Sequence, residues 1–254
     1  MRFFIINLRS SNDRRKRMEE NIKHIFAQDP SFANEAEFSF FVAHTPSDVK
    51  NTGFDKRYSR FLAGIFKARE VRPGEIGCFA SHFTLWERCV ELNEPIFILE
   101  DDVDFYAPFI EGVRMIVASK YDYVRLSWST FQPMYLLSEH FAFSPHLILG
   151  TPGYYITPFA AKRLIKGARK FGVAVDYYMS FSYLHNVPEM LYLPRLIGIN
   201  ELDEQTTIGK PEHQIKDKTF YRRFVLLREL HRVYRDIRMW IFARLALAYL
   251  KRLG

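Results

Sequence analysis

Three consecutive acidic residues carry the strongest chemical signal in this chain. Glu100, Asp101 and Asp102 directly follow the apolar run Ile96–Leu99, which is typical of a short buried strand. In open α/β sheets, ligands bind outside the carboxyl ends of the strands. Adjacent carboxylates repel one another unless a cation or a hydrogen-bonded ligand lies among them, and oxygen ligands suit Mg²⁺ or Mn²⁺. With Asp104 as a fourth acid, the pattern favours a divalent metal site over an acidic turn that caps the next element.

Asp176 is a second acidic residue with chemical potential. It follows the apolar residues 173–175 and precedes Tyr177 and Tyr178. Such surroundings can desolvate a carboxylate and raise its pKa, which a general base requires. A helix N-cap is an equally good interpretation of the same pattern. Asp176 is therefore a candidate base and a candidate cap.

His82, Cys78 and Cys89 fall within one expected helix. We interpret His82 as a histidine of the core. A zinc site made of these three residues is rejected, because the spacing lacks a short Cys-x-x-Cys pair and a fourth ligand. The two cysteines lie about 16 Å apart along a helix, too far for a disulfide. We expect them to be buried thiols in a reducing compartment.

Apolar strands alternate with amphipathic helices along the chain, which predicts an α/β sheet covered on both faces. Residues 45–54 contain Pro46, Gly53 and several polar residues, so we predict a loop there. Strands are expected at 3–8, 38–43, 96–99, 121–126 and within 147–156, and helices at about 12–26, 73–90 and 160–171.

Length and composition describe a globular protein. The chain has 254 residues, of which 48% are hydrophobic and 16% aromatic, and this excludes disorder as the main state. No run of about 18 apolar residues is present, so no transmembrane helix is expected. The first residues do not form a secretory signal, and we expect the protein to stay inside the cell.

The positive charge is concentrated in the last part of the chain. Residues 216–252 contain 11 basic and 3 acidic residues, while the whole chain has a net charge of +7, so residues 1–215 are nearly neutral. Apolar residues recur at helical spacing in this tail. We therefore predict a domain at 1–215 and a tail of basic amphipathic helices at 216–254 that binds an anionic membrane surface. The alternative is a tail packed on the domain. A neutral body argues against a nucleic-acid partner.

Four segments stand out together, in this order along the chain: Ile6–Leu8 followed by Arg14 and Arg15, Pro73–Cys78 with Ser81, His82 and Trp86, Ile98–Val103, and Tyr154–Leu164 followed by Asp176. With these segments the chain resembles glycosyltransferase family 25, which includes bacterial lipooligosaccharide galactosyltransferases and collagen galactosyltransferases. The resemblance covers about residues 3–199, and the tail lies outside it. Where family members often have Asp-Gly after the second strand, this chain has residues 44–46, His-Thr-Pro.

The resemblance implies a single GT-A-like domain with a mixed, mostly parallel sheet, a nucleotide-sugar donor, a divalent metal and inversion at the sugar carbon. Asp102 would bind the metal, as the last acid of similar triplets does in other GT-A enzymes. Asp176 would be the base. The residues that would bind the donor are Asn7, Arg14, Thr45, Glu100 and Asp101.

The expected reaction transfers a hexose, with galactose from UDP-galactose as the first choice, to a core sugar of lipooligosaccharide. It would take place at the cytoplasmic face of the inner membrane, where a lipid-linked acceptor is built. UDP-glucose or another hexose donor is one alternative, since no motif distinguishes galactose from its epimer. A non-catalytic carbohydrate-binding protein, with the acids as a structural cation site, is another.

Overall fold

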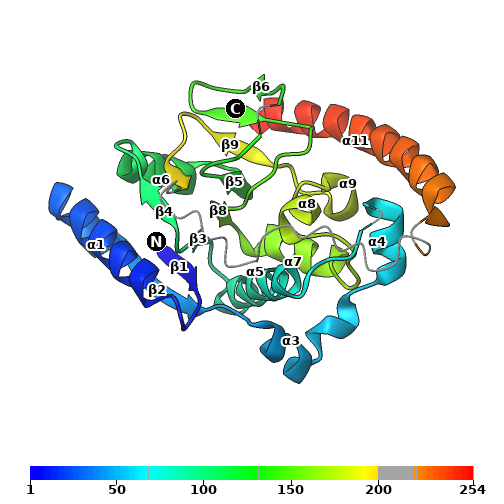
Figure 1. The fold of residues 1–254 in the computed structure, drawn as a ribbon. Helices are drawn as coiled ribbons and strands as arrows, with labels where there is room; N and C mark the ends of the chain where they lie inside the picture. Colours follow the sequence, from blue (N-terminus) through cyan, green and yellow to red (C-terminus); the bar gives the residue numbers. More distant parts are fainter. Residues whose placement is uncertain (68, 131, 200–219, 221, 254) are drawn as a thin grey trace.

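The computed structural model describes residues 1–67, 69–130, 132–199, 220 and 222–253 (Figure 1). Its centre is one sheet with the strand order β2-β1-β3-β8-β5-β9-β7-β6, and β4 pairs with β10 in a second, small sheet. The strands are β1 (Arg2–Asn7), β2 (Glu37–Val42), β3 (Ile96–Glu100), β4 (Val103–Phe105), β5 (Tyr123–Arg125), β6 (Tyr135–Leu136), β7 (Phe141–Phe143), β8 (Gly153–Ile156), β9 (Met190–Tyr192) and β10 (Ile197–Ile199).

The large sheet is mixed, and most of its strands run in one direction. β1 pairs in parallel with both β2 and β3, and β5 pairs in parallel with β9. β8 runs antiparallel to its neighbours β3 and β5, and β7 runs antiparallel to β9 and β6. This confirms the predicted α/β class, and it is consistent with a GT-A-like single domain.

Helices cover both faces of the sheet, as Figure 1 shows. Side chains alternate between the faces of a strand, so Phe97 and Leu99 pack with α1 and α6 while Ile96 and Ile98 pack with α5 and α7. The helices are α1 (Asn12–Gln28), α2 (Phe32–Glu35), α3 (Pro46–Thr52), the 3₁₀ turn η1 (Phe54–Arg57), α4 (Arg60–Phe66), α5 (Pro73–Leu92), α6 (Phe109–Ala118), α7 (Pro158–Gly167), α8 (Val175–Met179), α9 (Ser182–His185) and α11 (Val225–Leu253).

The loop predicted at residues 45–54 is wrong, because most of this segment is the helix α3. Pro46 occupies the first helical turn, where its missing N–H costs nothing. Thr45 and Asp48 form a capping box, in which each side chain accepts a hydrogen bond from the other's backbone N–H. Gly53 ends the helix with a φ of 71°, a left-handed conformation that glycine adopts without strain. The residues that suggested a loop therefore mark the two ends of a helix.

The C-terminal helix α11 packs on the body along one side only. Ala243, Ala246 and Leu250 are buried in the apolar cluster that contains Phe141. The predicted domain boundary at 215/216 lies outside the described residues. No helix in the described part of the chain is both long enough and apolar enough to cross a membrane.

Candidate functional site

A cleft of about 640 Å³ lies at the carboxyl ends of β1 and β2. Its lining comes from the last residues of β2, the residues that follow β1 and β2, the helix α3 and one side chain of α5. His44 shapes it, because its Nε2 lies 3.0 Å from the Thr84 hydroxyl and its backbone N–H donates to the Ser81 hydroxyl at 2.8 Å. The lining residues are Leu8, Arg9, Ser10, Phe41, Val42, Ala43, His44, Thr45, Asp48, Asn51, Thr52 and Thr84.

The acidic triplet lies at the end of β3, which is the strand next to β1 on the side away from β2. Both carboxylate oxygens of Asp101 are engaged. Asn7 Nδ2 donates to Oδ2 at 2.6 Å, and Arg14 Nη1 donates to Oδ1 at 3.2 Å. All three residues are buried. Asn7 and Arg14, predicted as donor-binding residues, thus hold Asp101 in this structure.

Asp102 is the more accessible of the two aspartates. Its side chain is 20% exposed, and Arg14 Nη1 lies 3.6 Å from its Oδ2. Carboxylate oxygens are the ligands that Mg²⁺ and Mn²⁺ prefer. The donor chemistry at Asp102 therefore fits the implied divalent metal, whereas the oxygens of Asp101 already accept protein hydrogen bonds.

Glu100 faces a different set of neighbours. Its Oε1 accepts a hydrogen bond from the Thr151 hydroxyl at 3.2 Å. Burial, and then the negative charge of Asp102, raise the pKa of Glu100 to about 8. An ion pair in the core supports this contact, because Arg125 bonds to Glu189 and to the carbonyl of Gly150, the residue before Thr151.

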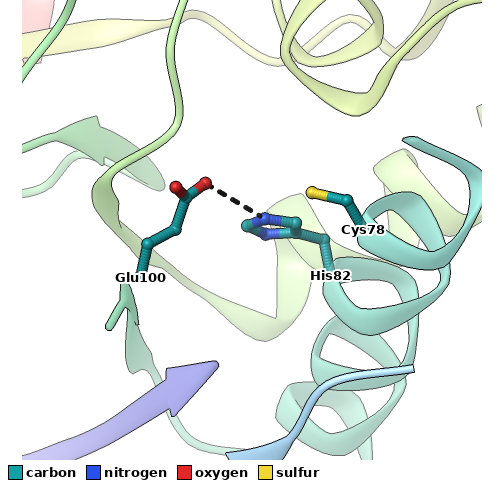
Figure 2. A group of neighbouring side chains, drawn as sticks. All are labelled: Cys78, His82 and Glu100. Atoms are coloured by element: carbon teal, nitrogen blue, oxygen red, sulfur yellow. Dashed lines mark ion pairs between the residues drawn. The ribbon is translucent and has the colours of Figure 1, made fainter. Parts of the chain in front are cut away.

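His82 and Cys78 lie on α5, opposite Glu100 (Figure 2). One ligand atom from each of the three side chains lies within 4.8 Å of the other two. Burial, with a smaller effect of the Arg125 charge, lowers the pKa of His82 to about 3, so the ring is neutral. Burial raises the pKa of the Cys78 thiol well above its usual value, as does the charge of Glu100.

The sequence predicts a core histidine at position 82, and the side chain is fully buried. The cysteines are free, as predicted, but only Cys89 is buried by surface exposure, while Cys78 is partly buried. Cys89 points elsewhere, since its thiol contacts the carbonyl of Ile156. Glu100 instead completes a trio with Cys78 and His82. Sequence reasoning missed this trio, because Glu100 follows β3 and the other two belong to α5.

Asp176 lies in the short helix α8, within electrostatic range of Glu100 and Cys78. Its charge contributes to the raised pKa values of Glu100 and Cys78. Its Oδ1 accepts a hydrogen bond from the backbone N–H of Tyr177 at 2.8 Å. The Lys67 ammonium lies 3.6 Å from the centre of the Tyr177 ring, and this cation was not among the predicted site residues.

Thr45 lines the cleft, while its hydroxyl also donates to Asp48 at 2.7 Å. Sequence reasoning missed Asn51 and Thr52, because it treated their helix as a loop. Arg9 is one of the arginines after the first strand, and it lines the cleft. The structure thus brings Asn7 and Arg14 into direct contact with Asp101, and Arg14 close to Asp102, while Thr45 follows β2 on the other side of β1 from the triplet.

The model of a family described as "Glycosyltransferase family 25 (LPS biosynthesis protein)" matches residues 1–179. The matched region includes both strands that border the cleft, the acidic triplet and Asp176. This chain therefore belongs to glycosyltransferase family 25.

Similar proteins come from animals and bacteria. A "Glycosyltransferase 25 family member" of Anopheles gambiae is 36% identical over 110 residues, which cover 40% of this chain and 16% of the relative. Procollagen galactosyltransferase 2 of Mus musculus is 27% identical over 198 residues, 71% of this chain and 30% of the relative. Lipooligosaccharide biosynthesis protein lic2B of Haemophilus influenzae is 34% identical over 101 residues, 39% of this chain and 33% of the relative. The chain thus matches a third or less of each relative's length.

Proposed function

We propose that this protein transfers a sugar from a nucleotide-sugar donor to a glycan acceptor. The observation that carries the proposal is the cleft at the ends of β1 and β2, which opens beside the carboxylates at the end of β3. A nucleotide in the cleft would place its diphosphate and sugar near Asp102 and Glu100. Arg9 on the cleft wall adds a cation that suits a phosphate.

Asp102 would hold the divalent metal, Mn²⁺ or Mg²⁺. Such an ion, when bound, neutralises the charge that develops on a departing nucleoside diphosphate. Asn7 and Arg14 hold the carboxylate of Asp101 by hydrogen bonds. This would fix the backbone from which the neighbouring Asp102 side chain projects. Arg14 also offsets part of the negative charge of the triplet, since it lies within 3.6 Å of Asp102.

Asp176 would act as the general base. It would accept the proton of the acceptor hydroxyl as that oxygen attacks the anomeric carbon from the face opposite the leaving group, which inverts the configuration. Its location in α8, within electrostatic range of Glu100, supports this role. The hydrogen bond from the Tyr177 N–H fixes one carboxylate oxygen and leaves the other for the acceptor.

Galactose from UDP-galactose is the donor that we propose, with a lipooligosaccharide core sugar as the acceptor. The names of two relatives support this choice: one is a procollagen galactosyltransferase and one a lipooligosaccharide biosynthesis protein. UDP-glucose is the main alternative donor. Release of UDP from a panel of UDP-sugars, with and without lipooligosaccharide, tests the proposal. Acceptor-dependent release from UDP-galactose supports it, and no release from any donor overturns it.

A lipid-linked acceptor also requires access to a membrane, and we propose that α11 provides it at the cytoplasmic face of the inner membrane. Exposed apolar residues recur every three or four positions along this helix, so they form one stripe, which we call the α11 stripe. Figure 1 shows α11 at the periphery of the molecule. The α11 stripe consists of Leu226, Leu230, Val233, Ile237, Trp240 and Ile241.

Basic residues near both ends of the α11 stripe support an anionic lipid surface as its partner. Arg222 and Arg223 precede the helix, and Arg244, Lys251 and Arg252 lie at its far end, all exposed. The Arg244 guanidinium lies 4.3 Å from the centre of the Trp240 ring. A helix with an apolar stripe and flanking cations is suited to lie in the plane of the lipid headgroups.

A further inference from the structure

A buried chain of hydrogen bonds runs from Trp86 through Tyr154 to His82, and the far side of the His82 ring lies near Glu100. Trp86 Nε1 donates to the Tyr154 hydroxyl oxygen at 2.8 Å, and the same oxygen lies 2.9 Å from His82 Nδ1. The other ring nitrogen, Nε2, lies 3.9 Å from Glu100 Oε1 (Figure 2). This Nε2 is fully buried and has no hydrogen-bond partner among the described residues.

The chemistry of the three groups decides where the hydrogens lie. An indole N–H can only donate, so the Tyr154 oxygen accepts from Trp86. Burial raises the pKa of Tyr154 well above its usual value, so the hydroxyl keeps its one hydrogen. Within the described part of the chain, His82 Nδ1 is the acceptor within reach of that hydrogen. Because the ring is neutral, its own hydrogen must then be on Nε2.

The carboxylate oxygen 3.9 Å from Nε2, Glu100 Oε1, already accepts a hydrogen bond from another residue. The Thr151 hydroxyl donates to the same Glu100 Oε1 at 3.2 Å. A movement of less than 1 Å would bring Oε1 from 3.9 Å to within hydrogen-bonding distance of Nε2 as well. Two donors on Oε1 would favour the ionised form of Glu100, whose pKa burial otherwise raises to about 8. They would also fix the plane of the carboxylate and leave Oε2 to accept from a ligand.

We propose that His82 is a positioning residue, held by Tyr154 in the Nε2–H tautomer, which orients Glu100 so that Oε2 accepts a hydrogen bond from a hydroxyl group of the donor sugar. The statement about the sugar rests on the function proposed above, and the tautomer does not. The Nε2–H tautomer also argues against a transition metal bound by Cys78, His82 and Glu100, because a protonated ring nitrogen has no lone pair to offer.

Nitrogen NMR of the full-length protein, labelled with ¹⁵N-histidine and without ligand, tests the tautomer. We expect the pattern of a neutral ring with Nε2 protonated. Trp86→Phe frees the Tyr154 oxygen to accept from Nδ1–H, so this variant should show a mixture of the two tautomers. A wild-type ring protonated on Nδ1 would overturn the proposal. So would a stoichiometric shift of the His82 nitrogens on addition of Zn²⁺.

Two substitutions test the positioning role. His82→Gln can place an amide N–H near the position of Nε2, whereas His82→Asn is too short and reaches only the position of Nδ1. We expect UDP to bind equally to both variants, and UDP-galactose to bind about 10- to 100-fold more weakly to His82→Asn but within a few-fold of wild type to His82→Gln.

Isothermal titration calorimetry of each variant with UDP and with UDP-galactose measures this difference. Equal loss of UDP binding in both variants would show a merely structural role, and wild-type affinity for UDP-galactose in both would show no role at all. If the wild type binds UDP but binds none of the UDP-sugars, the proposed function and the contact to the sugar fail. The NMR result on the tautomer is independent of that outcome.

Discussion

The three acids of the triplet differ in their surroundings although they are adjacent in sequence. Asp101 is buried and accepts hydrogen bonds from Asn7 and Arg14, Asp102 is partly exposed, and Glu100 contacts Thr151. Alternation along the chain turns successive side chains to different sides at the end of a strand. Asp101 therefore maintains the local structure, Asp102 is the partly exposed acid that we propose as the metal ligand, and Glu100 faces His82.

The first prediction concerns the proposed metal ligand. Asp102→Asn removes the charge with little change in shape, so we expect transfer activity to be lost while unfolding stays cooperative. Excess chelator should stop the wild type, and Mn²⁺ should restore it. Activity with each metal and circular dichroism during thermal unfolding measure these effects.

Asp104→Asn is the matched control for this prediction. It removes the same charge from the same acidic run. Asp104, however, is bound to the protein itself, because it accepts a hydrogen bond at 3.1 Å from Asn21 of α1. We expect its activity to remain within a few-fold of wild type. Full activity of the wild type in chelator, or equal losses in both variants, would refute the role given to Asp102.

The second prediction concerns the proposed base. Asp176→Asn should lower turnover by about 10²- to 10⁴-fold, because an amide cannot accept the acceptor's proton. Binding of UDP, measured by calorimetry, should stay close to that of the wild type. A variant that keeps its turnover but loses affinity for the donor would show that Asp176 binds substrate and that another group is the base.

At the scale of elements, α5 connects the cleft with the carboxylates. Its residue Gly77 lies against the turn after β2: a Cβ added there would be 2.5 Å from the carbonyl oxygen of His44. One turn further along, Ser81 accepts the N–H of His44, and His82 faces Glu100. Gly77 and Ser81 thus contact the turn that lines the cleft, while their neighbours Cys78 and His82 lie beside Glu100.

The third prediction follows from this close approach. Gly77→Ala should push the turn at His44 away from α5, and overpacking of this kind costs about 1–3 kcal/mol. Because that turn lines the cleft, UDP should also bind more weakly. Gly74→Ala on the same helix is the control: Gly74 is partly exposed, and alanine favours a helix, so stability should stay equal or rise. Denaturant unfolding and calorimetry measure both effects, and unchanged UDP binding in Gly77→Ala would refute the link to the cleft.

The sequence was sufficient to predict the strands at β1, β2 and β3 and the helix α5, because their apolar periods are strong. It was insufficient for α3, since Pro46 and Gly53 are common both in loops and at helix ends. The contact between Asn7 and Asp101 joins residues 94 positions apart, and that between His82 and Tyr154 joins residues 72 apart. Such contacts depend on strand order, which local patterns do not determine.

At the scale of the whole molecule, α11 has two different sides. One side contributes Ala243, Ala246 and Leu250 to the core, so the helix is fixed to the body rather than separate from it. The other side carries the α11 stripe, with Leu226, Ile237 and Trp240 each more than half exposed. The packed-tail interpretation therefore describes one side of this helix, and membrane binding stays a prediction for the other side.

The last prediction tests the α11 stripe without disturbing the packed side. Replacing Leu230, Ile237 and Trp240 together by glutamate should abolish binding to anionic vesicles of phosphatidylglycerol and phosphatidylethanolamine in a flotation assay. It should leave the melting temperature and the release of UDP with a water-soluble acceptor unchanged, because these side chains are exposed. Val117→Glu, an exposed apolar residue of α6, is the control and should float as the wild type does. Binding by the wild type should weaken as salt rises, since the arginines and lysine near the ends of the α11 stripe attract the lipid phosphates through a screened interaction. The membrane proposal would fail if the wild type did not bind anionic vesicles at low salt. It would also fail if sedimentation showed a dimer that the triple substitution abolishes, because the α11 stripe would then bind a second copy of the chain.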